Sequence, residues 1–222
     1  MRMIRSLFSR GGILAAGLLW CSGLLATPTM AASVTYNFTG DVTGVDSLVS
    51  SKFNNSMTMS GSMTVDNVDQ FPGSGAAGIY AVQSFTVSIG GYTATLGPSA
   101  DSSTIVFNAP TGDGFFSLIE QINGENVNFL GPRNFTMGLF GPSTIWDSDA
   151  LPTSVPSLSS FASVNEFRLG FGPVGVNAGV SGVLTSLTAV PLPAAVILFG
   201  AGLISLVGLG AGGLRNLHGS KV

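Results

Sequence analysis

The clearest structural signal in the chain is the run Phe85-Thr86-Val87-Ser88-Ile89-Gly90-Gly91-Tyr92-Thr93-Ala94-Thr95-Leu96. Apolar and polar side chains alternate on both sides of Gly90-Gly91, which is the period of two strands that each bury one face. Gly-Gly allows positive φ at both central positions of a two-residue hairpin loop. Pairing Ile89 with Tyr92 brings the apolar side chains of both arms to one face, whereas a slip of one residue would mix the faces. The run therefore predicts a β-hairpin in a defined register.

Similar alternating runs recur on both sides of this hairpin. They cover Val34–Phe38, Met57–Val65, Phe115–Ile122, Val127–Leu130, Phe135–Phe140, Glu166–Phe171 and Val180–Thr188. Asn123-Gly124 predicts a hairpin turn between the third and fourth of these runs, with a loop of either two or four residues. The Ser/Pro-rich segment Asp147–Ser160 predicts a loop, and Gly170–Gly182 predicts a loop or spacer. Short strands with frequent turns predict an all-β fold, an antiparallel β-sandwich or jelly-roll-like body in one domain.

The charged residues are few and unevenly distributed. All eleven acidic residues lie between the two apolar ends of the chain, where the cations are only Lys52, Arg133 and Arg168, so this middle part has a net charge of −8. A surface of this sign repels phosphate backbones, which argues against nucleic-acid binding. The single Cys21 and the single His218 lie outside this part. Because the commonest nucleophile, general-base and zinc-ligand side chains are missing there, we expect no enzyme, no cofactor and no metal site.

The N-terminal end has the three parts of a secretory signal peptide. Three arginines precede an uncharged, mostly apolar run over Gly11–Leu25, and small residues follow. These features predict export through the Sec translocon, with signal peptidase removing residues 1–31 by cleavage after Ala31; cleavage after Ala32 is the alternative. Trp20 directly before Cys21 is too large for a lipoprotein signal. The apolar run is also short for a membrane span, which needs about 20 residues.

The C-terminal end has the length and charge of a single membrane span. Ala194–Leu214 is an uncharged apolar stretch, which as a helix would extend roughly 30 Å, the thickness of the hydrocarbon core. Arg215 and Lys221 follow it and predict a stop on the cytoplasmic side, with the rest of the chain outside the inner membrane. The alternatives are a plain membrane anchor and a buried core helix, although a core helix without a polar face would be unusual in a domain of this size.

A short proline-containing motif, Val190-Pro191-Leu192-Pro193-Ala194, precedes this span. Motif, span and basic tail in this order at the C-terminus resemble the PEP-CTERM protein-sorting signal in its VPLPA-type variant, with Leu192 where the namesake motif has Glu. The resemblance covers residues 190–222 and implies recognition by an exosortase, removal of the tail near the motif, and transfer of the body to the cell surface or matrix. It also implies a Gram-negative bacterium that makes extracellular polysaccharide.

The nucleophile in such processing belongs to the exosortase, so the resemblance makes this chain a substrate. The expected organisation is a signal peptide over residues 1–31, a β-rich extracytoplasmic domain over residues 32–189 and a sorting signal over residues 190–222. For the β-rich domain we expect a structural or interaction role at the cell surface or in the polysaccharide matrix.

A carbohydrate-binding module is the main alternative. Sugar rings could stack on Tyr80, Tyr92 or Trp146, although core packing explains these aromatic side chains equally well. Two aspartate pairs could supply oxygen ligands for calcium, but their spacing fits neither an EF-hand nor an RTX repeat, and ordinary turn aspartates explain them better. These pairs are Asp66 with Asp69 and Asp147 with Asp149. No spacing among the acidic residues singles out the carboxylate pair of a glycosidase.

Overall fold

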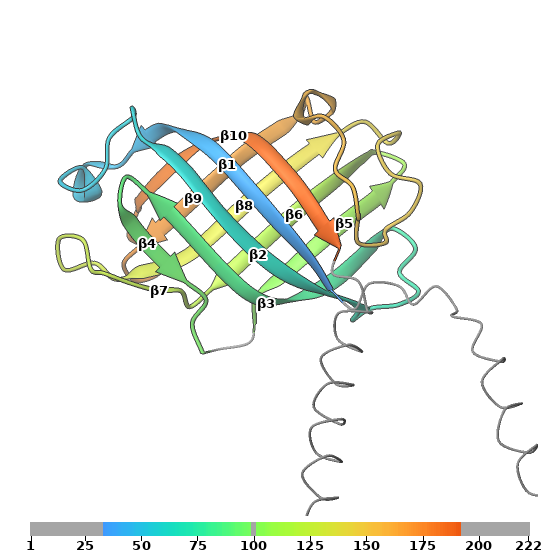
Figure 1. The fold of residues 1–222 in the computed structure, drawn as a ribbon, viewed down its shortest axis with the longest axis horizontal. Helices are drawn as coiled ribbons and strands as arrows, with labels where there is room; N and C mark the ends of the chain where they lie inside the picture. The colour runs from blue at the N-terminus through green and yellow to red at the C-terminus, as the bar shows by residue number, and fades with distance from the viewer. Residues whose placement is uncertain (1–32, 99–100, 192–222) are drawn as a thin grey trace, which may run out of the picture.

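A computed structural model describes residues 33–98 and 101–191, which fold into strands and two short 3-10 helices (Figure 1). The strands are β1 (Ser33–Val45), β2 (Thr58–Asp69), β3 (Ala77–Ile89), β4 (Tyr92–Thr95), β5 (Ser103–Ala109), β6 (Gly112–Glu120), β7 (Asn123–Gly124), β8 (Pro132–Gly141), β9 (Val164–Phe171) and β10 (Ala178–Pro191), and the 3-10 helices are η1 (Ser47–Val49) and η2 (Leu158–Ser160). Within these described ranges, no helix has the length and apolar character needed to cross a membrane. The predicted signal peptide and the apolar segment 194–214 lie outside the described residues.

Eight of these strands form one closed sheet. Their order is β2-β1-β10-β9-β8-β6-β5-β3, and β3 pairs again with β2, so the sheet closes into a barrel of antiparallel neighbours. The prediction of an antiparallel all-β body is confirmed. A single closed sheet takes the place of the two facing sheets expected of a sandwich or jelly roll. The register shifts of β1 at Thr39/Gly40 and Val42/Gly44 contribute to closure, because such irregularities increase strand twist and let a sheet curve onto itself.

β3 and β4 form the predicted hairpin. Ile89 pairs with Tyr92 and Val87 with Ala94, and the turn glycines Gly90 and Gly91 have φ of 53° and 84°. A two-residue turn with positive φ at both positions matches the right-handed twist of the strands that it joins. The register predicted from the sequence is confirmed.

The hairpin turn predicted at Asn123-Gly124 is wrong. These two residues form β7, which pairs with the end of β4, while β6 pairs along its length with β8. Residues 127–130 do not form a strand but a tight turn, closed by hydrogen bonds in both directions between Val127 and Leu130. Because β8 offers β6 a longer partner than residues 127–130 could, residues 121–131, which contain β7, form the connection between β6 and β8 at one end of the barrel.

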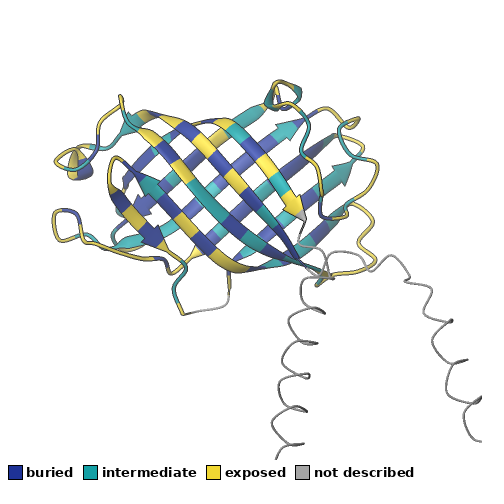
Figure 2. Ribbon diagram, in the orientation of Figure 1, coloured by how far each residue is buried: buried dark blue, intermediate teal, exposed yellow. Residues whose placement is uncertain are grey.

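Aromatic side chains fill much of the barrel interior. Buried residues alternate with more exposed ones along much of the longer strands, as Figure 2 shows. Inside, the rings of Phe38, Phe85 and Phe135 pack with centroid distances of 5.0, 5.7 and 6.3 Å. An eight-stranded barrel is just wide enough for side chains to fill its interior. The ends and the outer wall are therefore the surfaces that remain for binding.

Long loops cover both ends of the barrel. Residues 46–57, between β1 and β2, bury Phe53 against two aromatic rings of the interior. Residues 142–163, between β8 and β9, bury Leu151 and Phe161 at the other end. This second loop contains the Ser/Pro-rich segment, which is a loop as predicted except for η2. Between β9 and β10, by contrast, only residues 172–177 form a loop. Most of Gly170–Gly182, which was predicted as a loop or spacer, is therefore strand.

The first and last described residues lie side by side at one end of the barrel. β1 starts there and β10 finishes there, with Val34 paired with Pro191 (Figure 1). We call this end, which loop 142–163 covers, the terminal end. The opposite end, which carries loop 46–57 and the β9–β10 turn over residues 172–177, is called the far end.

Candidate functional site

A groove lies at the far end of the barrel, where β6 ends, β8 begins and β9 turns into β10. It has two adjoining parts of about 530 and 390 Å³, and Gln121 and Arg133 line both. Glu120, Asn134 and residues 174–177 complete the larger part. Residues 129–132 and the start of the β9–β10 turn complete the smaller part. Both parts are widely open to solvent, so they form a shallow groove and not an enclosed cavity.

Backbone strain is concentrated around this groove. Among the residues that the structure describes, three non-glycine residues have positive φ, namely Gln121 at 50°, Asn128 at 47° and Phe129 at 68°. Asparagine tolerates this region, whereas a bulky residue such as phenylalanine seldom adopts it. Strained residues persist only where their surroundings hold them, and they cluster at binding sites and active sites.

The turn that contains Phe129 is held by hydrogen bonds of Asn128, whereas the ring of Phe129 is exposed. The side-chain nitrogen of Asn128 donates to the carbonyl of Leu48 at 2.7 Å, and its side-chain oxygen accepts from the hydroxyl of Ser51 at 3.2 Å. The side chain of Phe129, by contrast, is 100% exposed. The loop therefore presents an aromatic ring to solvent at the edge of the groove.

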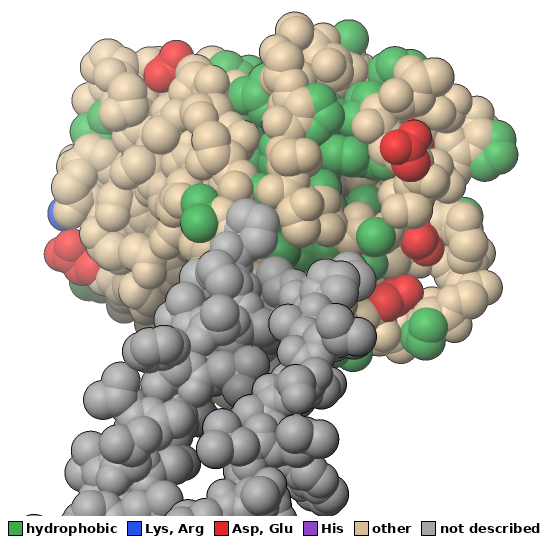
Figure 3. Space-filling model, turned by 45° about the vertical axis from the view of Figure 1, so that its right-hand side comes forward, with side chains coloured by type: hydrophobic (Ala, Val, Ile, Leu, Met, Phe, Trp, Pro, Cys, Tyr) green, Lys and Arg blue, Asp and Glu red, His purple; other side chains and the backbone are tan. Residues whose placement is uncertain are grey.

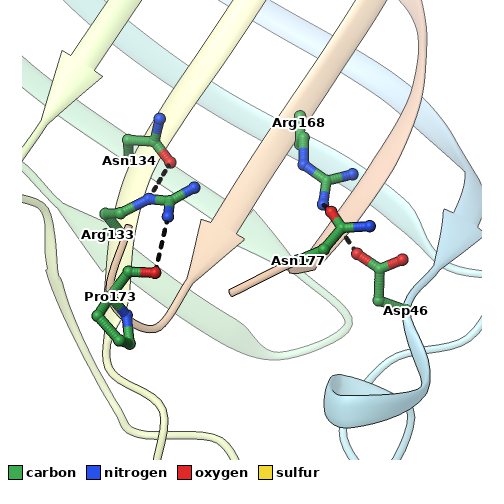
Figure 4. Close-up of polar contacts among 6 residues, drawn as sticks. All are labelled: Asp46, Arg133, Asn134, Arg168, Pro173 and Asn177. Atoms are coloured by element: carbon green, nitrogen blue, oxygen red, sulfur yellow. Dashed lines mark hydrogen bonds and ion pairs between the residues drawn. The ribbon is translucent and has the colours of Figure 1, made fainter. Parts of the chain in front are cut away.

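Arg133 lies between the two parts of the groove. Its Nε donates to Oδ1 of Asn134 at 3.3 Å and its Nη1 donates to the carbonyl of Pro173 at 3.1 Å (Figure 4). Gly170 makes room for this arrangement, because a Cβ there would meet Oδ1 of Asn134 and lie 3.3 Å from Nη2 of Arg133. A guanidinium has five N–H donors, so these two bonds leave it further donors for a ligand.

Arg168 fixes the turn on the other side of the groove. Its Nη2 lies 2.8 Å from Oδ2 of Asp46 and donates to Oδ1 of Asn177 at 2.8 Å (Figure 4). The guanidinium crosses β10 at Gly179, where a Cβ would lie 3.0 Å from its central carbon. These contacts tie the β9–β10 turn to the end of β1 and so position Asn177 in the groove.

The three cationic residues of the described chain all lie at the far end. Lys52 pairs with Glu125 at 3.2 Å, and Arg168 pairs with Asp46 at 2.8 Å. Arg133 forms no ion pair within residues 33–98 and 101–191. In a body with a large excess of carboxylates, Arg133 is thus the cation available to a ligand.

The aspartates considered for calcium lie at the terminal end and serve its turns and loop. Asp66 accepts the backbone N–H of Val68, and Asp69 accepts those of Phe71 and Ile79 on the two sides of the β2–β3 connection. Asp147 and Asp149 belong to loop 142–163, where the carbonyl of Asp149 accepts the hydroxyl of Tyr80 at 2.9 Å. Several carboxylates are visible on the face that Figure 3 brings forward. Nowhere in the described residues do three or more His, Cys, Asp or Glu side chains gather to hold a metal ion.

The aromatic residues considered for sugar stacking belong to the core. Tyr80 and Tyr92 are only 4% and 1% exposed, and Trp146 is half-buried against Phe161. The ring that borders the groove belongs to Phe129, which the sequence analysis placed in a strand. Asn128 before it was the one available signal, because asparagine enters the left-handed region more readily than other non-glycine residues.

Tyrosine hydroxyls fasten the loops at both ends of the barrel. The hydroxyls donate to backbone carbonyls, from Tyr36 to Pro152 at 2.6 Å, from Tyr80 to Asp149 at 2.9 Å and from Tyr92 to Glu125 at 3.0 Å. Burial raises the pKa of Tyr92 to about 12, and the Glu125 carboxylate adds to this shift. Burial is also the main cause that raises the pKa of Tyr36 and of Tyr80.

The predicted sorting motif begins inside the barrel wall. Val190 and Pro191 are the last two residues of β10, and Val190 pairs with Thr35 of β1. The rest of the predicted processing residues lie outside the described ranges, namely Leu192, Pro193 and Ala194 of the motif, Ala31 and Ala32 at the signal cleavage site, and Arg215 and Lys221 at the membrane stop.

Comparisons with protein-family models, with curated proteins and with solved structures found no match to this chain. What the groove can do follows from its side chains. An unpaired guanidinium, three side-chain amides and an exposed ring can together bind a small anionic ligand through hydrogen bonds and apolar contact.

Proposed function

We propose that this chain is an exported protein of the cell surface or extracellular polysaccharide matrix of a Gram-negative bacterium, where it acts by binding. The Sec translocon and signal peptidase process its N-terminal end. An exosortase in the inner membrane recognises its C-terminal sorting signal, with residues 194–214 spanning the membrane until the tail is removed. The barrel itself is the part that is delivered.

The observation that carries this proposal is the position of the chain ends relative to the groove. Val34 and Pro191 pair at the terminal end, so the segments before and after the barrel leave from the same end. The groove with Phe129 and Arg133 lies at the far end. A barrel held at its terminal end therefore keeps the groove free, which is the arrangement that a surface-held binding protein needs.

The junction between barrel and motif supports the same proposal. β10 continues through Val190 and Pro191, so no spacer separates the folded body from the motif. An exosortase that recognises the motif works directly against the terminal end. The far end then points away from the membrane throughout processing.

The intact mass of the protein recovered from its native host tests this proposal. We expect a chain that begins at Ala32 and lacks the apolar segment 194–214, recovered from the cell surface or the medium. A mass that retains the whole tail would identify a plain membrane anchor. Recovery of the uncleaved chain from the cytosol would overturn the proposal.

A pair of variants separates recognition of the motif from general effects on export. The double change Pro191→Ala and Pro193→Ala should leave the tail in place if the motif is the recognised element. Pro156→Ala, in loop 142–163, is the matched control and should be processed normally. Equal processing of both variants would contradict the role given to the motif.

A further inference from the structure

We propose that the groove at the far end binds a sugar unit that carries a carboxylate, with Arg133 holding the carboxylate and Phe129 packing against a face of the sugar ring. This inference rests on the proposed function, since it names the ligand class of the barrel that is delivered to the surface. Arg133, Phe129 and the amides between them carry the argument.

The charge of the groove matches a singly charged ligand. Lys52 and Arg168 are neutralised by acidic partners, whereas Arg133 has backbone and amide partners only. A guanidinium binds a carboxylate through two parallel N–H bonds, which gives both affinity and orientation. Glu120 in the same groove disfavours a group that carries two negative charges, such as a phosphate monoester. One carboxylate per sugar unit fits this balance.

The apolar border of the groove matches a sugar ring. The side chains of Phe129 and Val174 are 100% and 92% exposed, and they line the two adjoining parts of the groove. One face of a pyranose ring carries C–H groups, which pack against an aromatic ring. The strained turn fixes the backbone of Phe129 before any ligand arrives, so binding has to order the ring alone.

The polar lining matches the hydroxyls of such a ring. Gln121, Asn134 and Asn177 line the larger part of the groove together with Arg133. A side-chain amide both donates and accepts hydrogen bonds, as a sugar hydroxyl does. Asn134 and Asn177 are held in place by Arg133 and Arg168. A partly fixed set of amides of this kind favours an oriented hydroxylated ligand.

The closed sheet disfavours a peptide as the occupant. Peptides that bind to β-proteins commonly add a strand to a free sheet edge. The strands that border the groove, β6, β8, β9 and β10, are each paired on both sides. An extended peptide would therefore find side-chain contacts here but no backbone ladder.

Titration calorimetry with the purified full chain in detergent tests this inference. The probes are oligomers of galacturonate, mannuronate and glucuronate, and the matching neutral hexose oligomers serve as controls. We expect at least one uronate oligomer to bind at least about tenfold more tightly than its neutral counterpart. Binding of the neutral oligomers with equal affinity would overturn the role of Arg133, and binding of none of the oligomers would overturn the inference.

Two matched pairs of variants locate the binding to the groove. Arg133→Gln should weaken uronate binding about tenfold or more, whereas Lys52→Gln removes a cation from the same end outside the groove and should change it less than about twofold. Phe129→Ala should weaken binding by a similar factor, whereas Phe71→Ala, an exposed ring at the terminal end, should leave it unchanged. Circular dichroism checks that each variant is folded. Equal effects within either pair would overturn the assignment.

The calorimetry and the intact-mass experiment test different claims, so either can give a negative result without the other. Calorimetry on the purified chain does not depend on export, and the intact mass does not depend on the groove. If the tail is removed as proposed but no uronate binds, the proposed function stands with another ligand. If uronate binds but the chain keeps its tail, the protein is a membrane-anchored binding protein.

Discussion

The ring of Phe129 is fully exposed while its backbone is held at φ of 68°. A non-glycine residue in this region costs on the order of 1–3 kcal/mol, and an exposed ring contributes little burial energy in return. Asn128 and its contacts to loop 46–57 keep the turn in this form. The free protein is therefore less stable than it could be, which is expected of a residue kept for binding.

Replacing Phe129 with glycine should stabilise the protein. Phe129→Gly should raise the free energy of unfolding by roughly 1 kcal/mol, because glycine adopts positive φ without strain. Urea unfolding of the full chain in detergent, followed by tryptophan fluorescence, measures this difference. Phe71→Gly is the control, since Phe71 is exposed but has no positive φ, and it should lower stability by about 0.5–1 kcal/mol. A Phe129→Gly chain less stable than the parent would contradict the strain argument.

Asp113 connects the barrel wall to loop 142–163. The residue is fully buried in β6, and its Oδ2 accepts the backbone N–H groups of Ile145 at 2.8 Å and Trp146 at 2.9 Å. A hydrogen bond contributes about 0.5–1.5 kcal/mol, and donors left unpaired after the acceptor is removed add a penalty. A single side chain thus holds the start of the loop that covers the terminal end.

Removing the Asp113 carboxylate should loosen this loop. Asp113→Ala should lower the free energy of unfolding by roughly 2–4 kcal/mol, since two N–H groups lose their partner. Hydrogen exchange should show faster exchange at the amides of Ile145 and Trp146 before global unfolding. Asp147→Ala, at an exposed position of the same loop, should change stability by less than about 0.5 kcal/mol. Unchanged protection at both amides would contradict the role assigned to Asp113.

Glycines let neighbouring strands of the wall pack closely at particular points. Gly61 of β2 faces the interior, where a Cβ would lie 2.5 Å from both the ring of Phe38 and the carbonyl of Thr86. Gly138 of β8 instead has its nearest neighbours at 3.7 Å, an ordinary van der Waals distance. Two glycines in similar strands thus have opposite tolerance for a side chain.

Alanine at these two glycines should have opposite effects. Gly61→Ala should lower the free energy of unfolding by roughly 1–3 kcal/mol through overpacking. Gly138→Ala should be neutral or raise it by about 0.5 kcal/mol, because alanine has less freedom to lose in the unfolded chain. Thermal unfolding of the two variants measures the difference. Equal stability of the two would mean that the wall around Gly61 is less tightly packed than the structure has it.

A strand pairing that depends on a local turn could be predicted from the sequence. A pairing decided by competition between distant strands could not. The Gly90-Gly91 hairpin was predicted with its register, because the turn and both arms lie within twelve residues and one register alone separates apolar from polar faces. Asn123-Gly124 also gave a local turn signal, although it did not choose between a two- and a four-residue loop, but β6 pairs with the longer β8. A turn dipeptide decides the structure only when no longer-range pairing competes for the same strand.

Neither the closure of the barrel nor the position of the groove could be predicted from the sequence, because both depend on residues that are far apart in the chain. Closure depends on the pairing of β1 with β10, whose residues lie at opposite ends of the described chain. The groove combines residues 120–134 with residues 172–177. Arg133 was recognised as one of three cations in the acidic body, but only the folded structure shows that the other two are paired.

Alkaline pH should destabilise the whole molecule through its tyrosines. The unfolded chain loses a tyrosine proton near pH 10, while burial raises the pKa of Tyr92 in the folded state to about 12. The folded state therefore keeps a proton that the unfolded state releases, so its stability is full below about pH 10 and falls as pH rises toward 12. Urea midpoints measured from pH 9 to 12 test this. Tyr92→Phe should be less stable near neutrality but should show a shallower fall, and an unchanged slope would contradict the assignment.

The central claim is that the chain is held at the terminal end with its groove facing away. Fluorescence quenching in proteoliposomes tests it most directly, using the full chain with Cys21→Ser and a single dye attached at Phe71→Cys or Phe129→Cys. A quencher on the lipid headgroups should dim the dye at position 71 of the terminal end and leave the dye at position 129 of the far end nearly unchanged. Equal quenching at both positions, or stronger quenching at position 129, would contradict the account.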